Sequence, residues 1–256
     1  MSRESVRFVA LGDSASCGVG DPTPDGWRGW AQILAEAMAV DHDVAFRKLA
    51  IPGACASDVR REQLAPALDH RPLMASLVVG LNDALRSSWE PARLRDDLLH
   101  CAGELAAEGT ILMTVRFHDH TRVLGLPGPL ARPLRRRLDV LNEIYDEVHE
   151  RYGVIRLDLA EHPDIYDRDM WAVDRIHPSE KGHRWLAFQA ALLLRAEGLD
   201  FAPPSLVCTS DRMRPRELAR ILLLDMAPWL GRRAGEFGPW AAREAVRRGR
   251  GRLLAA

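Results

Sequence analysis

Short runs of apolar and β-branched residues alternate with longer segments of helical periodicity along most of the chain. Five of these runs have little internal polar alternation, which is typical of strands buried on both faces of a parallel sheet. They are Val6–Leu11, Val44–Leu49, Ser76–Val79, Thr110–Val115 and Val154–Leu157. The helical pattern predicts helices over Trp27–Ala39, Asp58–Leu68, Pro91–Glu108, Pro133–Arg151 and Ser179–Glu197. Because right-handed βαβ crossovers place helices on both faces of a sheet, this order predicts a three-layer α/β/α sandwich with a central five-stranded parallel sheet.

Two parts of the chain depart from this alternation. Between the fourth strand and the next helix, prolines and glycine-proline pairs interrupt any periodic pattern over Phe117–Arg132, so this segment is predicted to be irregular and is a candidate pocket lining. After Pro203-Pro204 the alternation stops and an Arg-rich helical pattern follows. We therefore predict one domain over 1–202 and a helical C-terminal extension over 203–256.

Composition and charge narrow the class of protein. An apolar fraction of 47% with 28% charged residues is that of a globular chain. The net charge of −1 conceals a segment, 205–256, that holds eleven Arg against five Asp or Glu. These arginines alternate with Leu, Ala and Trp at helical intervals, as on a solvated helix face, so we expect no nucleic-acid partner. No apolar run approaches the ~20 residues of a membrane span and no apolar leader precedes the first strand, so a cytoplasmic location is the expectation.

Residues that can carry chemistry follow four of the predicted strands. Ligands of open α/β sheets bind at the carboxyl ends of the strands, so these positions are the natural place for a reactive site. They are Gly12-Asp13-Ser14 after the first strand, Gly53 after the second, Gly80-Leu81-Asn82-Asp83 after the third, and Asp174-Arg175-Ile176-His177 after the fifth. Each fragment alone also fits an ordinary turn or helix cap, because turns and caps prefer Asp, Ser, Asn and Gly.

Ser14, His177 and Asp174 have the chemistry of a nucleophile with its activating pair. A serine hydroxyl is a weak nucleophile at its ordinary pKa, so a histidine must accept its proton and a carboxylate must fix the tautomer of that histidine. An aspartate three residues before the histidine is able to reach Nδ1 while Nε2 faces the serine. No Gly-x-Ser-x-Gly elbow occurs in the sequence, which sets it apart from the α/β-hydrolase pattern.

Together these blocks resemble the SGNH, or GDSL-type, hydrolase superfamily, whose serine, glycine, asparagine and histidine occur in the same order. Ser14 lies in the first block, with Ala15 in place of the usual leucine, and Gly53, Asn82 and His177 match the others. The resemblance covers most of the predicted domain and implies a flavodoxin-like fold with esterase or lipase activity and no cofactor. It also implies an oxyanion hole formed by the backbone N–H groups of Ser14 and Gly53 and the side-chain amide of Asn82.

Other polar residues near these blocks are candidates for supporting roles. Asp13 is expected to orient the Ser14 loop, while Asp83 and Arg86 are candidates for contacts behind the site or with substrate, and Arg86 fits a surface salt bridge equally well. His118-x-His120 follows the fourth strand and has the spacing of a metal-ligand pair. No clear third ligand accompanies it, so no metal is expected.

The sequence therefore predicts an enzyme that cleaves a small-molecule carboxylic (acyl) ester through an acyl-enzyme on Ser14. An acyltransferase or a carbohydrate-ester deacetylase that uses the same site is the main alternative, because a fold does not choose among substrates. A non-catalytic binding protein with a basic docking tail is a further alternative. The apolar segment Val123–Pro127 favours an apolar acyl group, and nothing in the sequence specifies the oligomeric state.

Overall fold

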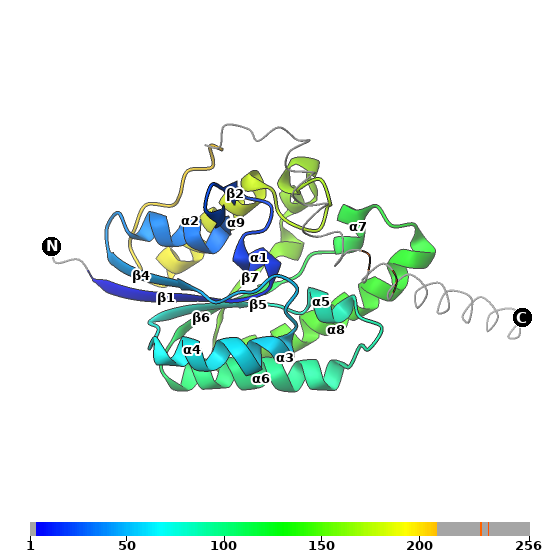
Figure 1. Cartoon of the computed structure of the whole chain (residues 1–256), viewed down its shortest axis with the longest axis horizontal. Helices are drawn as coiled ribbons and strands as arrows, with labels where there is room; N and C mark the ends of the chain where they lie inside the picture. Colours follow the sequence, from blue (N-terminus) through cyan, green and yellow to red (C-terminus); the bar gives the residue numbers. More distant parts are fainter. Residues whose placement is uncertain (1–3, 209–230, 232–234, 236–256) are drawn as a thin grey trace, which may run out of the picture.

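The computed structural model describes residues 4–208, 231 and 235, so nearly all of the predicted extension over 203–256 lies outside the described residues. A parallel sheet in the order β4-β1-β5-β6-β7 forms the middle layer (Figure 1). Its strands are β1 (Ser5–Gly12), β4 (Asp43–Lys48), β5 (Met74–Val78), β6 (Ile111–Arg116) and β7 (Ile155–Asp158). Each lies within about two residues of its predicted position, and the predicted five-stranded sandwich is confirmed.

Helices cover both faces of the sheet (Figure 1). On one face, α2 (Gly29–Met38) packs against α9 (Glu180–Ala196). On the other lie α4 (Leu64–Asp69), α6 (Pro91–Ala107) and α8 (Gly128–Tyr152). None of the helices in the described part of the chain is both long and apolar enough to cross a membrane.

Strand β1 divides its side chains between two cores. Phe8 and Ala10 belong to the core under α2 and α9, whereas Val9 and Leu11 belong to the core under α6 and α8. Burying each large apolar side chain is worth about 1.5–3 kcal/mol, so this alternation fixes the face and register of the strand. Strand β1 pairs with β4 on one side and with β5 on the other, and ligand crevices form where the strand order reverses in this way. The residues that follow β1 lie at that reversal.

Short elements complete the connections. They are α1 (Ser14–Cys17), the hairpin of β2 (Pro22–Thr23) and β3 (Gly26–Trp27), α3 (Ala56–Asp58), the π-helical turn η1 (Val59–Gln63), α5 (Leu81–Ala84), α7 (His120–Leu124), and the 3-10 turns η2 (Leu159–Glu161), η3 (Pro163–Tyr166) and η4 (Arg168–Met170). The hairpin replaces the predicted start of the first helix, because Gly26 turns the chain at φ +130°. Trp27 therefore lies in β3, and only Trp30 is in the helix and buried.

The prediction of an irregular segment over Phe117–Arg132 is wrong for most of its length. Helix α7 forms within it, capped by the carboxylate of Asp119. Helix α8 begins at Gly128, and Pro133 lies inside it. A proline removes one backbone N–H and normally ends a helix, but the following Leu134 is fully buried, and tertiary packing of this kind stabilises the turn.

Helix α8 carries three buried polar side chains that hold the carboxyl ends of two strands. The Tyr145 hydroxyl accepts the N–H of Val79 at 3.0 Å and donates to the carbonyl of the same residue at 2.8 Å. The Asn142 amide pairs with the N–H and the carbonyl of Phe117 at 2.8 and 2.9 Å. Arg137 donates to two carbonyls at the C-terminal end of α5. Helix α8 thus fixes the segments that follow β5 and β6.

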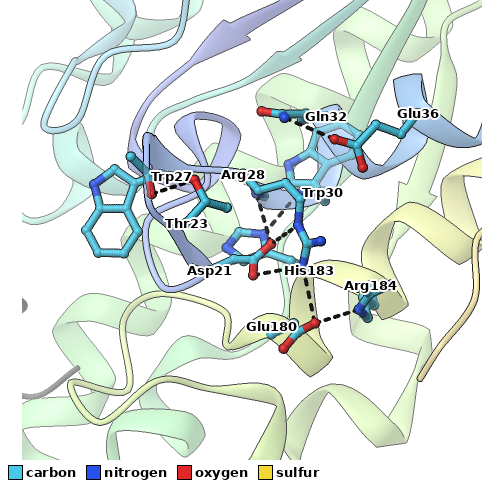
Figure 2. Close-up of polar contacts among 12 residues, drawn as sticks. Asp21, Thr23, Trp27, Arg28, Trp30, Gln32, Glu36, Glu180, His183 and Arg184 are labelled. Atoms are coloured by element: carbon cyan, nitrogen blue, oxygen red, sulfur yellow. Dashed lines mark hydrogen bonds and ion pairs between the residues drawn. The ribbon is translucent and has the colours of Figure 1, made fainter. Parts of the chain in front are cut away.

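A chain of charged side chains ties α2 to α9 (Figure 2). Asp21, 1% exposed, accepts hydrogen bonds from Arg28 on both carboxylate oxygens, at 2.9 and 3.1 Å. Arg28 also donates to Glu180 at 3.2 Å, and Arg184 donates to the same carboxylate oxygen at 2.9 Å. Because charges of alternating sign share these bonds, each offsets part of the desolvation cost of its neighbours. The start of α9 is therefore fixed beside the segment that follows α1.

His183, in the first turns of α9, is hydrogen-bonded through both ring nitrogens. Nδ1 accepts the backbone N–H of Trp30 at 3.2 Å and Nε2 donates to the carbonyl of Val19 at 3.1 Å, so the partners select the neutral Nε2–H tautomer. Burial lowers the pKa of His183 to about 4, although the Val19 carbonyl and Asp21 oppose the shift.

We predict that His183 makes the fold sensitive to acid. A histidine whose pKa is lower in the folded state than its usual 6.5 stabilises the fold above pH 6.5, and this stability is lost as the pH falls toward 4. His183→Gln should therefore reduce the slope of the unfolding free energy between pH 6.5 and 4.5 by about 1.4 kcal/mol per pH unit. Urea unfolding measures it, with His100→Gln on the exposed face of α6 as the control. Equal slopes in the wild type and His183→Gln would contradict the prediction.

Candidate active site

Ser14 begins helix α1 directly after β1 and is 7% exposed. Asp13 caps the helix by accepting the N–H of Ala15 at 3.0 Å. Gly12 adopts φ +137°, and a Cβ at this position would collide with the carbonyl of Val78 on β5. Only glycine lets β1 pass so close to β5 and still turn into the helix.

Gln63 holds the end of β1 from the opposite side. Its side-chain amide accepts the N–H of Gly12 at 2.8 Å and donates to the carbonyl of Gly12 at 2.9 Å. Gln63 ends the π-helical turn η1, a geometry that re-aims side chains and that often occurs at functional sites. The predicted helix over Asp58–Leu68 is present but starts at Ala56 and contains this turn.

His177 completes a hydrogen-bonded chain with Ser14 and Asp174. Its Nε2 lies 2.9 Å from Ser14 Oγ, and its Nδ1 lies 2.8 Å from Asp174 Oδ2. Since an ionised carboxylate only accepts, Nδ1 carries the proton and Nε2 is left to accept from the serine hydroxyl. The histidine is 1% exposed. The three residues that the sequence predicted as a catalytic set therefore meet in one place.

The loop that carries His177 is held by close backbone packing. The other oxygen of Asp174 accepts the N–H groups of Ile176 and His177 at 2.9 and 3.1 Å. A Cβ on Gly20 would collide with the carbonyl of Pro178, and a Cβ on Gly182 would collide with the carbonyl of Met170. The loop thus packs directly against the segment after α1 and against α9.

Asp174 is stabilised in its ionised form. Burial raises its pKa, but the hydrogen bond and the charge of His177, together with two backbone N–H groups, outweigh burial and leave the pKa below the usual 3.8. The same charge favours a protonated His177 while the serine reacts.

The three predicted oxyanion donors lie in the loops that follow β1, β4 and β5. Within the described part of the chain, the backbone N–H groups of Ser14 and Gly53 donate to no protein acceptor, and Gly53 adopts φ +84°. The Asn82 amide differs, because its Nδ2 donates to the carbonyl of Ala54 at 2.9 Å and contacts Asp13 Oδ2 at 3.3 Å. Asn82, 3% exposed, therefore joins the three loops to one another.

Asp13, which is buried, and Asp83, which is half-buried, lie beside the hydrogen-bonded chain. Burial raises the pKa of each to about 6, and the bonds from Ala15 to Asp13 and from Ala56 to Asp83 only partly oppose it. The positive charge of Arg86 also opposes the shift at Asp83. Arg86 is half-buried, and its Nε is enclosed without a hydrogen-bond partner among the described residues.

An apolar cavity of about 70 Å³ lies behind the serine and histidine. It reaches Ala15 next to the serine, and Ile176 and Pro178 on either side of the histidine. The remaining wall is mainly apolar and includes Met113, Val115, Leu157, Leu159, Ile165 and Trp171. The predicted acyl-binding segment Val123–Pro127 is not part of this wall, and Val123 is buried in the core instead.

His118 and His120, considered above as metal ligands, lie in the wall of this cavity. In the part of the chain that the structure describes, no group of three or more His, Cys, Asp or Glu side chains is arranged to hold a metal ion.

Several residues that position the site were missed in the sequence. Gln63, Asp21 and Arg28 lie outside the motif blocks and act through tertiary contacts. The available signal was a polar side chain on the apolar face of a predicted helix, as at Gln63, which is 1% exposed. The sequence alone does not show which residue such a side chain contacts.

Comparison with known proteins agrees with this geometry. Residues 10–185 match the model of the GDSL-like lipase/acylhydrolase family. No sequence among the curated proteins matches the chain.

Several solved structures are similar in fold. A psychrotrophic esterase from Pseudoalteromonas sp. has a TM-score of 0.57 at 16% identity, with 75% of this chain and 97% of that chain covered. A catalytic mutant of an acetylxylan esterase from Geobacillus stearothermophilus has a TM-score of 0.61 at 16% identity, with 82% and 99% covered. A lipase/acylhydrolase from Enterococcus faecalis has a TM-score of 0.58 at 20% identity, with 78% and 99% covered. Since the family match spans more than half of the sequence, this chain belongs to the GDSL-like lipase/acylhydrolase family and is an ester-hydrolysing enzyme.

Proposed function

We propose that the chain hydrolyses carboxylic esters of small molecules through an acyl-enzyme on Ser14. The observation that supports this most directly is the chain of two hydrogen bonds, 2.9 Å from Ser14 Oγ to His177 Nε2 and 2.8 Å from His177 Nδ1 to Asp174 Oδ2. This is the geometry that lets a neutral histidine remove a serine proton while a carboxylate holds the correct tautomer.

Acylation then follows from the positions of these atoms. The Ser14 hydroxyl proton passes to His177 Nε2 as Oγ bonds to the ester carbon, and the carbonyl electron pair moves to its oxygen. When the tetrahedral intermediate collapses, the bond to the alcohol oxygen breaks, and the alcohol takes the proton from Nε2 and leaves. Asp174 stabilises the imidazolium that exists between these steps.

Water completes the cycle by the same route. It gives a proton to His177 Nε2 as its oxygen attacks the acyl-enzyme, and the second tetrahedral intermediate releases the acid while Ser14 Oγ recovers the proton. In both intermediates the negative oxygen needs donors, and the unengaged N–H groups of Ser14 and Gly53 are the ones we assign to it. Losing one such donor costs about 2.7–4 kcal/mol of barrier in other serine hydrolases.

The cavity indicates the kind of acyl group. Its apolar wall favours an uncharged group, and a volume of about 70 Å³ favours a short one. We assign the acyl part of the ester to it because the alcohol must leave before water attacks, whereas the acyl group stays bound through both steps. An acyltransferase or a carbohydrate-ester deacetylase remains the alternative for the same residues, and a deacetylase also takes a short acyl group.

We predict that Ser14 alone reacts with a fluorophosphonate probe. One adduct per chain should appear by intact mass, and Ser14→Ala and His177→Ala should abolish or greatly slow it and lower ester turnover by at least about 10³-fold. Ser16→Ala on the same helix is the matched control, because the Ser16 hydroxyl is buried without a partner among the described residues. Labelling of Ser14→Ala at the wild-type rate would disprove the assignment of the nucleophile.

We predict that Asn82→Ala lowers kcat for an aryl ester by about 10²-fold. The loss comes from the loosening of the three loops that Asn82 joins, which carry the assigned oxyanion donors of Ser14 and Gly53. Asn142→Ala is the control for stability, because it too removes a buried amide that makes two hydrogen bonds. Both variants should lower the urea midpoint, but Asn142→Ala should change kcat by less than about tenfold. An equal loss of kcat in the two variants would mean that Asn82 acts only through stability.

We predict that Val115→Phe shortens the acyl group that the enzyme accepts. Val115 lines the cavity, so a larger side chain should lower kcat/KM for a hexanoyl ester at least tenfold more than for the acetyl ester of the same alcohol. Leu112→Phe is the control, because Leu112 lies on the same strand but packs into the opposite core. An unchanged preference in Val115→Phe would place the acyl group elsewhere.

A further inference from the structure

The proposed mechanism gives no task to the two histidines in the cavity wall. His118 lies after β6 and His120 begins α7, and each is 3% exposed. Trp171 packs on both rings, with centroids 4.9 and 5.1 Å away. Apart from these two imidazoles the cavity is almost entirely apolar.

The two rings bond to each other and leave one nitrogen each without a partner. His118 Nε2 and His120 Nδ1 are 3.1 Å apart. Among the described residues, His118 Nδ1 and His120 Nε2 are buried and make no hydrogen bond of normal geometry, although the Arg175 backbone lies close to His120. Native proteins rarely bury a polar atom unpaired, so two such atoms on side chains of one cavity wall indicate a bound group.

The charge state of the pair limits what that group is. Burial and the neighbouring His120 lower the pKa of His118 well below 6.5. Burial and His177 lower the pKa of His120 to about 4, although Asp174 and the Arg175 backbone oppose the shift. Both rings are therefore neutral near pH 7, and neither offers a positive charge to a carboxylate.

The shared hydrogen bond determines what the free nitrogens offer. Each neutral imidazole has one N–H and one nitrogen lone pair. The hydrogen bond between the two rings uses the N–H of one ring and the lone pair of the other. Whichever ring donates, one donor and one acceptor then remain on the outer nitrogens of the pair. A hydroxyl group can pair with either nitrogen, because it both donates and accepts, whereas an alkyl group satisfies neither.

We propose that His118 and His120 bind a hydroxyl group carried by the acyl part of the substrate, so that the preferred esters are those of short hydroxy acids. This rests on the proposed function, because it places the acyl group in the cavity behind Ser14 and His177. The apolar wall receives the carbon chain and the histidine pair recognises its single polar substituent.

The test compares matched ethyl esters by a pH-indicator assay. The wild type is given butanoate and hexanoate esters, the same esters with a hydroxyl at C2 or C3, and branched esters with a methyl group in place of that hydroxyl. For at least one hydroxyl position, kcat/KM should exceed that of both the parent and the methyl analogue by at least tenfold, since sites built to bond a hydroxyl discriminate strongly against analogues that lack it.

Two variants assign that preference to the histidines. His118→Phe and His120→Phe should bring the ratio of hydroxy ester to parent ester toward one, while His100→Phe, on the exposed face of α6, should keep it. If the Phe variants fold poorly by circular dichroism, His120→Gln keeps a donor and an acceptor and should retain part of the preference.

Three results would overturn the proposal. A wild type with no preference for any hydroxy ester contradicts it while leaving the proposed function intact, because the parent esters are still hydrolysed. A preference that survives both Phe variants assigns recognition to other residues. Absence of turnover on every ester together with no fluorophosphonate adduct removes the proposed function, and this inference with it.

Discussion

The hydrogen bond between Ser14 and His177 connects residues 163 positions apart in the chain, and the site depends on it. Proton transfer needs the two side chains within a few tenths of an ångström of their working distance, so both loops must be rigid. Helix α1 has only four residues, so its position depends on contacts with the rest of the structure. Backbone contact at Gly20 and the Asp21–Arg28–Glu180 chain provide that rigidity by fixing the start of α9 against the segment after α1.

Burial raises the pKa of the acids around this bond and lowers the pKa of the histidines. Asp13 and His120 are both shifted toward their neutral forms, because a charge inside the protein loses its hydration. Asp174 is the exception, because His177 and two backbone N–H groups stabilise its ionised form. Asp174 is therefore the acid of the site whose charge is stabilised where it holds the histidine, and the imidazoles in the cavity wall stay neutral near pH 7.

The predictions from sequence that are wrong concern segments where packing overrides the local conformational preference. Prolines and glycines over Phe117–Arg132 indicate an irregular segment, yet α7 and the start of α8 form there because their apolar side chains are buried. The π-helical turn that aims Gln63 at Gly12 has no recognisable local signal. Helix α8 was predicted, but not that Tyr145 and Asn142 on it would hold two strand exits.

The sequence by itself determined which strands precede the reactive residues. Apolar runs predicted the five strands, and the residues after them predicted Ser14, Asn82 and His177 at one edge of the sheet. This worked because buried strands and strand-end motifs are local patterns. Only the tertiary structure decided that the Asn82 amide also ties three loops together, and that His118 and His120 face an apolar cavity. These properties depend on distances between segments far apart in the chain, which no local pattern encodes.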